Sequence, residues 1–152
     1  MVIKATLCYI VQNGRILLIR KKRGFGAGKM NAPGGKIEDG ESPAAAAARE
    51  LEEEIGIRPQ QLQLLAEIDF HNDGVHEMHV YVFRSRAFEG TLRETEEADP
   101  KWFPVSDIPY DEMWPDDRIW LPLFLQGRKI KGTFHFRNGW KEMTEHEIEE
   151  LG

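Results

Sequence analysis

An α/β fold, in which a mixed β-sheet is sandwiched between helices as an α/β/α sandwich, is predicted by two features of the sequence. The first is a set of segments rich in β-branched and aromatic residues, separated by Asn-Gly or Asp-Gly pairs that are typical of β-hairpins. The second is a pair of segments with helical character, one in the first half of the chain and one near residue 120. Strands before, between and after helices favour a mixed sheet that is flanked by helices.

The strand predictions depend on turn residues. Asn13-Gly14 separates the strands expected over Val2–Gln12 and Ile16–Ile19, because both turn positions of such a hairpin need positive φ. Other strands are expected over Leu62–Phe70 and His76–Phe88 around Asn72-Asp73-Gly74, over Trp102–Val105, and over Thr133–Arg137 and Trp140–Met143 around Asn138-Gly139.

Two smaller expectations concern side-chain direction and the end of the chain. His76 and His79 are three residues apart on an expected strand, so they should face opposite sides of the sheet. Thr144–Glu147 has the spacing of a capping box, although a helix starting there is too short to stand alone.

The first helix is expected from Ser42 to Ile55. Ser42 is a preferred N-cap, Pro43 suits the first helical position, and Gly56 suits the position after the last turn. On a helical wheel the buried stripe comprises Ala44, Ala48, Leu51 and Ile55, and Ala46 and Ala47 border the opposite, acidic face, where they leave room for a ligand. A second helix is expected over Ile119–Gln126, with Pro122 near its first turn.

Length and composition restrict the function. A chain of 152 residues suits one domain, residues 1–152, and a net charge of −6 argues against binding a nucleic acid polymer, which needs a basic surface. The lone Cys8 cannot form an internal disulfide and fits a reducing compartment. The sequence has no signal-peptide pattern and no apolar run of about 18 residues, the length that spans a membrane. We therefore expect a cytoplasmic monomer without a membrane partner.

Three glutamates of the first helix suggest a metal site. Glu50, Glu53 and Glu54 stand at i, i+3 and i+4, so their carboxylates lie on one face near the helix C-terminus. Such a face can simply be solvated, but like charges at this spacing repel each other and oppose the helix dipole. A hard divalent cation such as Mg²⁺ would offset the repulsion and would bring substrate phosphates with it.

The residues around these glutamates resemble a family signature. Gly35, Glu41 after five residues, and Arg49-Glu50-Leu51-x-Glu53-Glu54-x-Gly56-Ile57 after seven more match the Nudix box at every fixed position. The resemblance implies the Nudix fold and hydrolysis of a nucleoside diphosphate derivative with Mg²⁺, or with Mn²⁺ in its place. It also implies roles for individual residues: Glu53, Glu54 and the carbonyl of Gly34 or Gly35 as metal ligands, Glu50 as a ligand or the general base, Glu41 and Arg49 as an orienting pair, and Glu97 as an acidic residue from a later loop, with Glu94 and Glu96 as rivals.

Two segments, Lys21–Lys36 and Met113–Gly132, resemble the branch of the family formed by the mammalian MutT homologues, which hydrolyse oxidised purine nucleoside triphosphates. This resemblance implies that Asn31, Asp116 and Asp117 bind the base, that Trp114, Phe70 and Trp120 wall it, and that Thr6 and Lys21 lie near the base or sugar. The residue types suit these roles, because an indole ring stacks on a base, an amide donates and accepts, and adjacent acids can share a proton. Either aspartate could instead cap the second helix.

The substrate prediction keeps its alternatives. Met30, Pro33 and Asn72 depart from the mammalian pattern at places that border the pocket, and the resemblance fades after Arg137. The expected substrates are 8-oxo-dGTP and 2-hydroxy-dATP, which would be hydrolysed to the monophosphate and pyrophosphate. The alternatives are ADP-ribose, a dinucleoside polyphosphate or O6-methyl-dGTP as the substrate, or a non-catalytic nucleotide sensor.

Overall fold

The computed structural model describes residues 1–151. Its elements, in chain order, are β1 (Ile3–Gln12), β2 (Arg15–Lys21), β3 (Met30–Asn31), β4 (Gly34–Lys36), α1 (Pro43–Ile55), β5 (Ile57–Gln60), β6 (Gln63–Asn72), β7 (Val75–Ser85), β8 (Ala87–Gly90), β9 (Ala98–Pro104), the 3₁₀ turn η1 (Tyr110–Glu112), α2 (Asp117–Leu125), β10 (Lys129–Arg137) and β11 (Glu142–Leu151).

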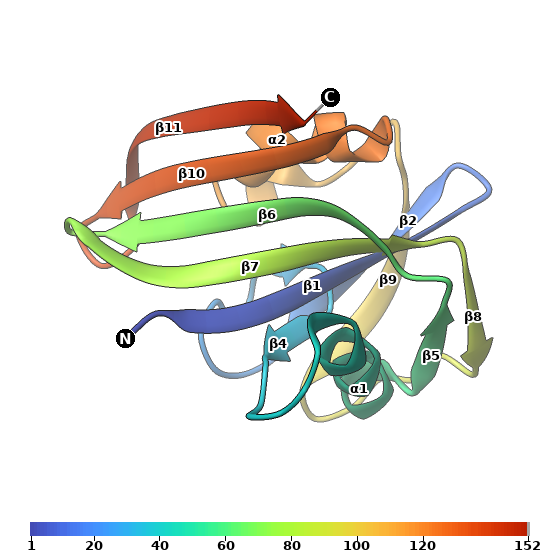
Figure 1. Cartoon of the computed structure of the whole chain (residues 1–152). Coiled ribbons are helices and arrows are strands. Elements are labelled where there is room, and N and C mark those ends of the chain that lie inside the picture. Colours follow the sequence, from blue (N-terminus) through green and yellow to red (C-terminus); the bar gives the residue numbers. More distant parts are fainter. Residues whose placement is uncertain (152) are drawn as a thin grey trace.

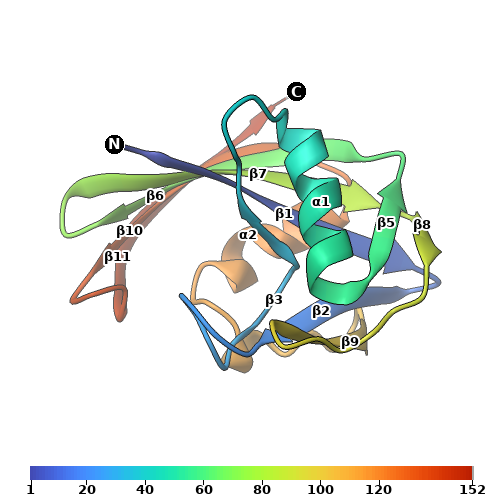
Figure 2. The ribbon, with the colours of Figure 1, turned by 90° about the horizontal axis from the view of Figure 1, so that it is seen from below.

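One mixed sheet dominates the structure (Figure 1). Its strand order is β11-β10-β6-β7-β1-β2-β3, with β4 paired to β1 and β9 paired to β2. The β1–β7 and β10–β6 pairs are parallel, and the other pairs of this sheet are antiparallel. The short strands β5 and β8 pair separately, next to the end of α1 (Figure 2).

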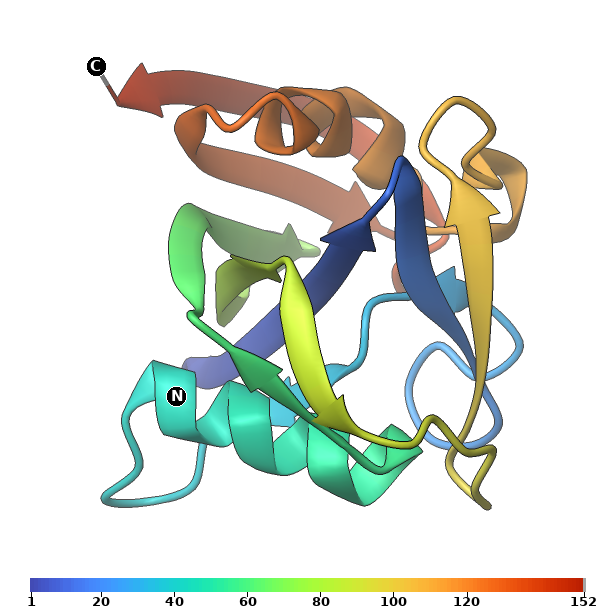
Figure 3. The same cartoon turned by 90° about the vertical axis from the view of Figure 1, so that its right-hand side faces the viewer.

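The two α-helices lie on opposite sides of the sheet (Figure 3). Leu51 and Ile55 of α1 belong to one buried cluster, and Trp120 and Phe124 of α2 belong to the other. The predicted mixed sheet between helices is therefore confirmed.

The ends of α1 are where the sequence predicts them. Ser42 Oγ accepts a hydrogen bond from the Ala45 N–H at 3.1 Å, and Pro43 is the first helical residue. Gly56 has φ +80° and donates its N–H to the Glu52 carbonyl at 3.0 Å, which closes the last turn. The helix that carries the Nudix box is therefore capped by its own sequence.

The buried side of α1 is rotated from the predicted stripe. Ala46 and Ala47 are fully buried, whereas Ala44 is exposed, so the expectation that Ala46 and Ala47 leave room for a ligand was wrong. β1, β4 and β5 pack against α1, and the glycine at position 35 lets the Glu50 side chain lie against β4. Glu54 is consequently buried along with Leu51 and Ile55.

The predicted hairpins are present, with corrected boundaries. Asn13-Gly14, Asp73-Gly74 and Asn138-Gly139 all have positive φ. Residues 144–147 belong to β11 and not to a helix, because β11 pairs along β10 over its whole length. The strand expected over His76–Phe88 breaks at residue 86, and its end turns away as β8 to pair with β5.

His76 and His79 do not face opposite sides, contrary to the strict alternation of a strand. His76 Nε2 and His79 Nδ1 each lie 2.7 Å from Asp69 Oδ1. The β6–β7 pairing is irregular between Phe70 and His71, which adds one residue to β7 and reverses the alternation there.

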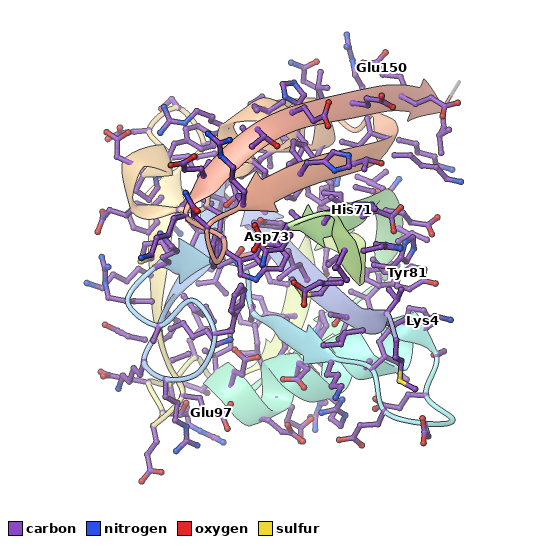
Figure 4. All side chains as sticks on the ribbon, turned by 90° about the vertical axis from the view of Figure 1, so that its left-hand side faces the viewer. Lys4, His71, Asp73, Tyr81, Glu97 and Glu150 are labelled. Atoms are coloured by element: carbon purple, nitrogen blue, oxygen red, sulfur yellow. The ribbon has the colours of Figure 1, made fainter. Side chains whose placement is uncertain are left out.

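A row of stacked imidazoles crosses the same face of the sheet. His71 on β6 stacks on His76 of β7 and on His135 of β10, with ring centroids 4.6 Å apart in both pairs (Figure 4). Burial lowers the pKa of His71, the neighbouring His135 and His76 lower it further, and the charge of Asp69 opposes them. The charged form of His71 is therefore disfavoured in the folded state.

We expect this row to weaken the fold in acid. A folded-state pKa below the ordinary value for histidine means that stability is present above about pH 6.5 and is lost as the pH falls. His71→Gln removes this linkage, so its melting temperature should fall less than that of the wild type between about pH 8 and about pH 5.5. His146→Gln, at an exposed histidine of β11, is the matched control. Equal acid sensitivity of the wild type and His71→Gln would contradict the prediction.

Candidate active site

One glycine of β4 allows that strand to lie close to β1, and the other allows a side chain of α1 to lie against it. A Cβ atom on Gly34 would stand 1.9 Å from the Thr6 carbonyl oxygen, and one on Gly35 would stand 2.6 Å from Cδ of Glu50. Glycine at position 34 therefore permits the β1–β4 backbone contact, and glycine at position 35 leaves space for the Glu50 carboxylate. Any larger residue at position 35 would displace that carboxylate.

Glu50 and Glu54 form a buried pair of like charges. Glu54 is 5% exposed, and its Oε1 accepts the Gly34 N–H at 3.3 Å. Burial raises the pKa of Glu54 to about 8; its hydrogen bond and repulsion with Glu50 add to the shift, as does the charge of Glu97, and the Gly34 N–H opposes it. The pair therefore tends to hold a proton unless a cation is present.

Arg49 orients the neighbouring acids. Its Nε and Nη2 donate to the two oxygens of Glu41 at 2.7 and 2.9 Å, and its Nη1 donates to Glu50 Oε1 at 2.9 Å. The hydrogen bonds from Arg49 lower the pKa of Glu41 to about 2, with help from the backbone N–H of Glu38. Arg49 is thus a fixed link between the loop before α1 and the buried carboxylates.

The remaining glutamates of the predicted set are placed differently. The Glu53 side chain is 54% exposed and is held by Arg49 Nη1 at 3.3 Å, apart from the buried pair. Glu97 lies near the end of α1 (Figure 4), where Thr95 Oγ1 accepts its N–H and donates to the Glu54 carbonyl. Its rivals Glu94 and Glu96 are more exposed and face Lys22 and Arg23, respectively. The structure therefore places Glu50 and Glu54 together, with Glu97 near enough for its charge to act on Glu54, and leaves Glu53 at the rim.

Gly35→Ala should separate catalysis from folding. The added methyl group meets a side chain and not the backbone, so Glu50 should rotate away and the fold should persist. We expect kcat to fall by roughly a hundredfold, because a misplaced catalytic carboxylate loses most of its contribution. Steady-state kinetics together with a thermal melt provide the check. A variant with full kcat would show that the position of Glu50 is not needed.

The predicted substrate residues share one cavity of about 250 Å³ that also reaches Glu54 and the glycines of β4. Those in its lining are Thr6, Lys21, Asn31, Phe70, Trp114, Asp116, Asp117 and Trp120. They come from β1, β2, β3 and β6 and from the start of α2, so the fold gathers residues that are far apart in the sequence. Their roles toward a substrate stay predictions.

Asp116 and Asp117 lie side by side at the closed end of this cavity and are only 3% and 2% exposed, respectively. Trp120 Nε1 donates to Asp116 Oδ2 at 2.8 Å, and the Trp114 N–H donates to Asp117 Oδ2 at 3.1 Å. Asp116 is the N-cap residue of α2, but its side chain makes no capping hydrogen bond. The capping alternative therefore does not describe Asp116.

Burial also sets the protonation of this pair. It raises the pKa of Asp116 to about 6, against the hydrogen bond from Trp120. It raises the pKa of Asp117 well above its usual range; the charge of Asp116 adds to this shift, whereas the Trp114 N–H and the charge of Lys29 oppose it. The two carboxyl groups therefore tend to share one proton near neutral pH.

Other polar groups in the pocket are free for a ligand. Asn31 Oδ1 accepts the Ala32 N–H at 2.8 Å, which fixes the amide and leaves its Nδ2 as a donor. In residues 1–151, the Thr6 and Tyr9 hydroxyl groups are buried without a hydrogen-bond partner. A buried hydroxyl without a partner is unfavourable, so the Thr6 hydroxyl at the cavity wall suits a polar substrate.

The sequence did not point to three lining residues. Phe25 and Trp140 contact each other at the mouth of the cavity, and Met78 lines it from β7. Phe25 was indistinguishable from other residues of a glycine-rich loop, and Trp140 follows the point where the family resemblance fades. Trp120 is 1% exposed and mainly supports Asp116, so its contribution as a wall is small.

The comparison with known families agrees with this geometry. A model of the NUDIX domain matches residues 1–124, so the chain belongs to the Nudix family and is a Nudix hydrolase. Enzymes of this family generally use a divalent metal ion.

Two relatives and one solved structure are similar to this chain over most of its length. The chain is 44% identical to the oxidized purine nucleoside triphosphate hydrolase of Danio rerio over 147 residues, which cover 96% of this chain and 94% of the relative. It is 43% identical to the enzyme of the same name from Mus musculus, over 88% and 86% of the two chains. The crystal structure of a mutator MutT protein from Bacillus halodurans superposes with a TM-score of 0.84 at 26% identity and covers 97% of this chain and 98% of that one.

The carboxylates fit a divalent cation. Glu50 and Glu54 supply hard oxygen donors, and their mutual repulsion is the kind that a cation relieves. Among residues 1–151, no three His, Cys, Asp or Glu side chains converge closely enough to form a complete cage, and Glu97 Oε1 lies 3.3 Å from Arg23 instead. Mg²⁺ in proteins commonly takes few carboxylates and completes its shell with water and phosphate, which suits this partial set.

In residues 1–151, neither helix has the length and apolar character needed to cross a membrane.

Proposed function

We propose that this Nudix hydrolase converts oxidised purine (deoxy)nucleoside triphosphates, such as 8-oxo-dGTP and 2-hydroxy-dATP, to the monophosphate and pyrophosphate and so cleans the nucleotide pool. The observation that carries the proposal is the single cavity that joins the Glu54 carboxylate to the Asp116–Asp117 pair. The names of the Danio rerio and Mus musculus relatives support the same substrate class.

The proposed cofactor is Mg²⁺, held by Glu50, Glu54, Glu97 and the Gly34 carbonyl, with Glu53 available from the rim and Mn²⁺ as a substitute ion. When bound, such an ion polarises a phosphoryl oxygen and lowers the pKa of a coordinated water molecule. Either Glu50 or Glu54 takes the proton of the attacking water, since Glu54 lines the cavity and Glu50 lies beside it. Arg49, anchored on Glu41, keeps Glu50 in place during this step.

The base is held at the other end of the cavity. Asn31 donates to an edge of the purine, and the Asp116–Asp117 pair accepts or donates according to the position of its shared proton. Trp114 and Phe70 supply apolar walls, and Thr6 and Lys21 lie near the base or sugar. A movable proton allows one pocket to accept both guanine-like and adenine-like oxidised edges.

The protein is further proposed to act as a monomer of one domain in the cytoplasm. All the site residues come from one chain, and the acidic composition disfavours a nucleic acid polymer as partner. The single cysteine, Cys8, is fully buried as a thiol, as suits a reducing compartment.

Kinetics on a substrate panel test the proposal. The panel compares kcat/KM for 8-oxo-dGTP, 2-hydroxy-dATP, O6-methyl-dGTP and dGTP, with ADP-ribose and a dinucleoside polyphosphate as the rival classes. We expect an oxidised purine triphosphate to be preferred over dGTP by at least about tenfold, the size of one good polar contact. The proposed function would be refuted if no modified base were preferred over dGTP, or if ADP-ribose were the preferred substrate.

A further inference from the structure

Trp140 has an unusual backbone for its residue type. It lies in the turn between β10 and β11 with φ +72°, directly after Asn138 and Gly139, which also have positive φ. Asparagine and glycine tolerate this region, but a large aromatic residue is strained there. The stability of the turn therefore does not explain why residue 140 is a tryptophan.

The neighbouring turn holds Trp140 in this position. Asn72 Oδ1 accepts the Trp140 N–H at 3.1 Å, and Asp73 Oδ1 accepts the Asn138 N–H at 3.2 Å. Asp73 also donates its own N–H to the Phe136 carbonyl at 2.9 Å. Two turns that are far apart in the sequence are thus joined at Asn72, one of the positions that depart from the mammalian pattern.

Trp140 forms part of the lining of the cavity. Its ring centroid lies 5.5 Å from that of Phe25 and 5.4 Å from that of Phe136. Phe25 in turn stacks on Trp114, with centroids 5.0 Å apart and planes 21° from parallel. We call these four residues, Phe25, Trp114, Phe136 and Trp140, the aromatic collar.

Within the aromatic collar, Phe25 depends on Trp140. Phe25 is 51% exposed and belongs to a loop in which Gly24, Gly26 and Gly28 all have positive φ. Such a loop has little rigidity of its own, so the position of the Phe25 ring is set by its two aromatic neighbours. Trp114 stacks on the Phe25 ring, and Trp140 packs against the same ring in a T-shaped arrangement.

We propose that Trp140 is a specificity-determining residue of the base pocket: it walls the purine at the mouth of the cavity and holds Phe25 against Trp114. The proposal rests on the proposed function, since it takes the ligand of the cavity to be a purine nucleotide. It places an aromatic side chain on the turn next to Asn72, in a part of the chain where the family resemblance has faded. The strain at residue 140 is then the consequence of aiming an indole into the pocket.

Trp140→Gly is the informative variant, because glycine relaxes the left-handed backbone while removing the ring. We expect the variant to fold, its KM for the preferred oxidised purine triphosphate to rise about tenfold, as fits one lost aromatic contact with a base, and its kcat to stay within about twofold. Trp140→Phe should recover most of the loss in KM. Asn138→Gly, at a positive-φ residue of the same turn, is the matched control and should keep the wild-type KM.

The outcomes separate the two proposals. If the wild type prefers an oxidised purine and Trp140→Gly keeps both its KM and its base preference, the role of Trp140 is refuted and the proposed function stands. If the wild type shows no such preference, the proposed function fails. The KM values of Trp140→Gly for dGTP and dCTP then test the role of Trp140, since loss of a purine wall should raise the KM for dGTP more than the KM for dCTP. A lower melting temperature together with a raised KM in both Trp140→Gly and Trp140→Phe would also overturn the proposal, in favour of a structural role for Trp140.

Discussion

Glu54→Gln is expected to lower kcat by roughly a thousandfold while the protein stays folded. The Glu54 carboxylate is the most buried of the box glutamates and is the one that lines the substrate cavity. Glutamine keeps the size and can keep the hydrogen bond from the Gly34 N–H, but it carries no charge for a cation and accepts no proton. Steady-state kinetics with saturating Mg²⁺ measure the loss directly.

The Glu54→Gln substitution should lower kcat but reduce the loss of thermal stability at high pH. The folded-state pKa of Glu54 is raised to about 8, so its contribution to stability is present at low pH and is lost as the pH rises. Without metal, the wild type should therefore melt at a lower temperature at about pH 9 than at about pH 6, and Glu54→Gln should lose less across this range. Added Mg²⁺ should stabilise the wild type and have little effect on the variant.

Glu52→Gln is the matched control, because it makes the same change at an exposed residue of the same helix that pairs only loosely with Arg58. It should retain wild-type kcat. Glu53→Gln should lose less activity than Glu54→Gln, since the Glu53 side chain lies half exposed at the rim. Full activity of Glu54→Gln would remove Glu54 from the metal site, and an equal loss in Glu53→Gln would bring the rim glutamate into it.

The environments of two glutamates of the Nudix box shift their pKa values in opposite directions. Glu41, paired with Arg49, has its pKa lowered to about 2 and stays charged. Glu54, buried beside Glu50, has its pKa raised to about 8 and can exchange a proton near neutral pH. Pairs of acids whose pKa values are pushed apart in this way commonly divide the roles of a site.

Features set by short stretches of sequence were predictable. Ser42, Pro43 and Gly56 define the ends of α1 through their own backbone preferences, and Asn13-Gly14 defines the first hairpin. The Nudix box likewise indicated the carboxylates of the site, because its spacing on a helix determines which acids are neighbours. The helices on two sides of a mixed sheet follow from the order of these elements.

Features set by contacts between distant segments were not predictable. The burial of Ala46 and Ala47 depends on the strands that pack against α1, which the helical wheel does not contain. The shared contact of His76 and His79 with Asp69 depends on an irregular pairing between β6 and β7. Trp140 reaches the cavity only because the β6–β7 turn holds its backbone, and nothing in residues 138–141 alone indicates this.

Asp117→Asn should change which base is accepted more than how fast a phosphate is cleaved. Asp117 is buried next to Asp116 at the end of the cavity that is proposed to hold the base, and the pKa of both groups is raised. Asparagine fits the same space and still accepts the Trp114 N–H, but it fixes one donor and one acceptor in place of a movable proton. We expect kcat/KM to fall about a hundredfold for one of 8-oxo-dGTP and 2-hydroxy-dATP and far less for dGTP.

The pH dependence of KM gives the second measurement for Asp117→Asn. Because the raised pKa values keep a proton on the Asp116–Asp117 pair at neutral pH, raising the pH removes a hydrogen-bond donor from the pocket of the wild type. The KM for the base that needs this donor should rise with pH in the wild type and stay nearly flat in Asp117→Asn. Asp111→Asn, at an exposed aspartate of η1, is the control and should behave as the wild type. A shared proton acts only on the edge of the base. An equal loss of kcat/KM for modified and unmodified purines in Asp117→Asn would therefore mean that Asp117 only supports Trp114.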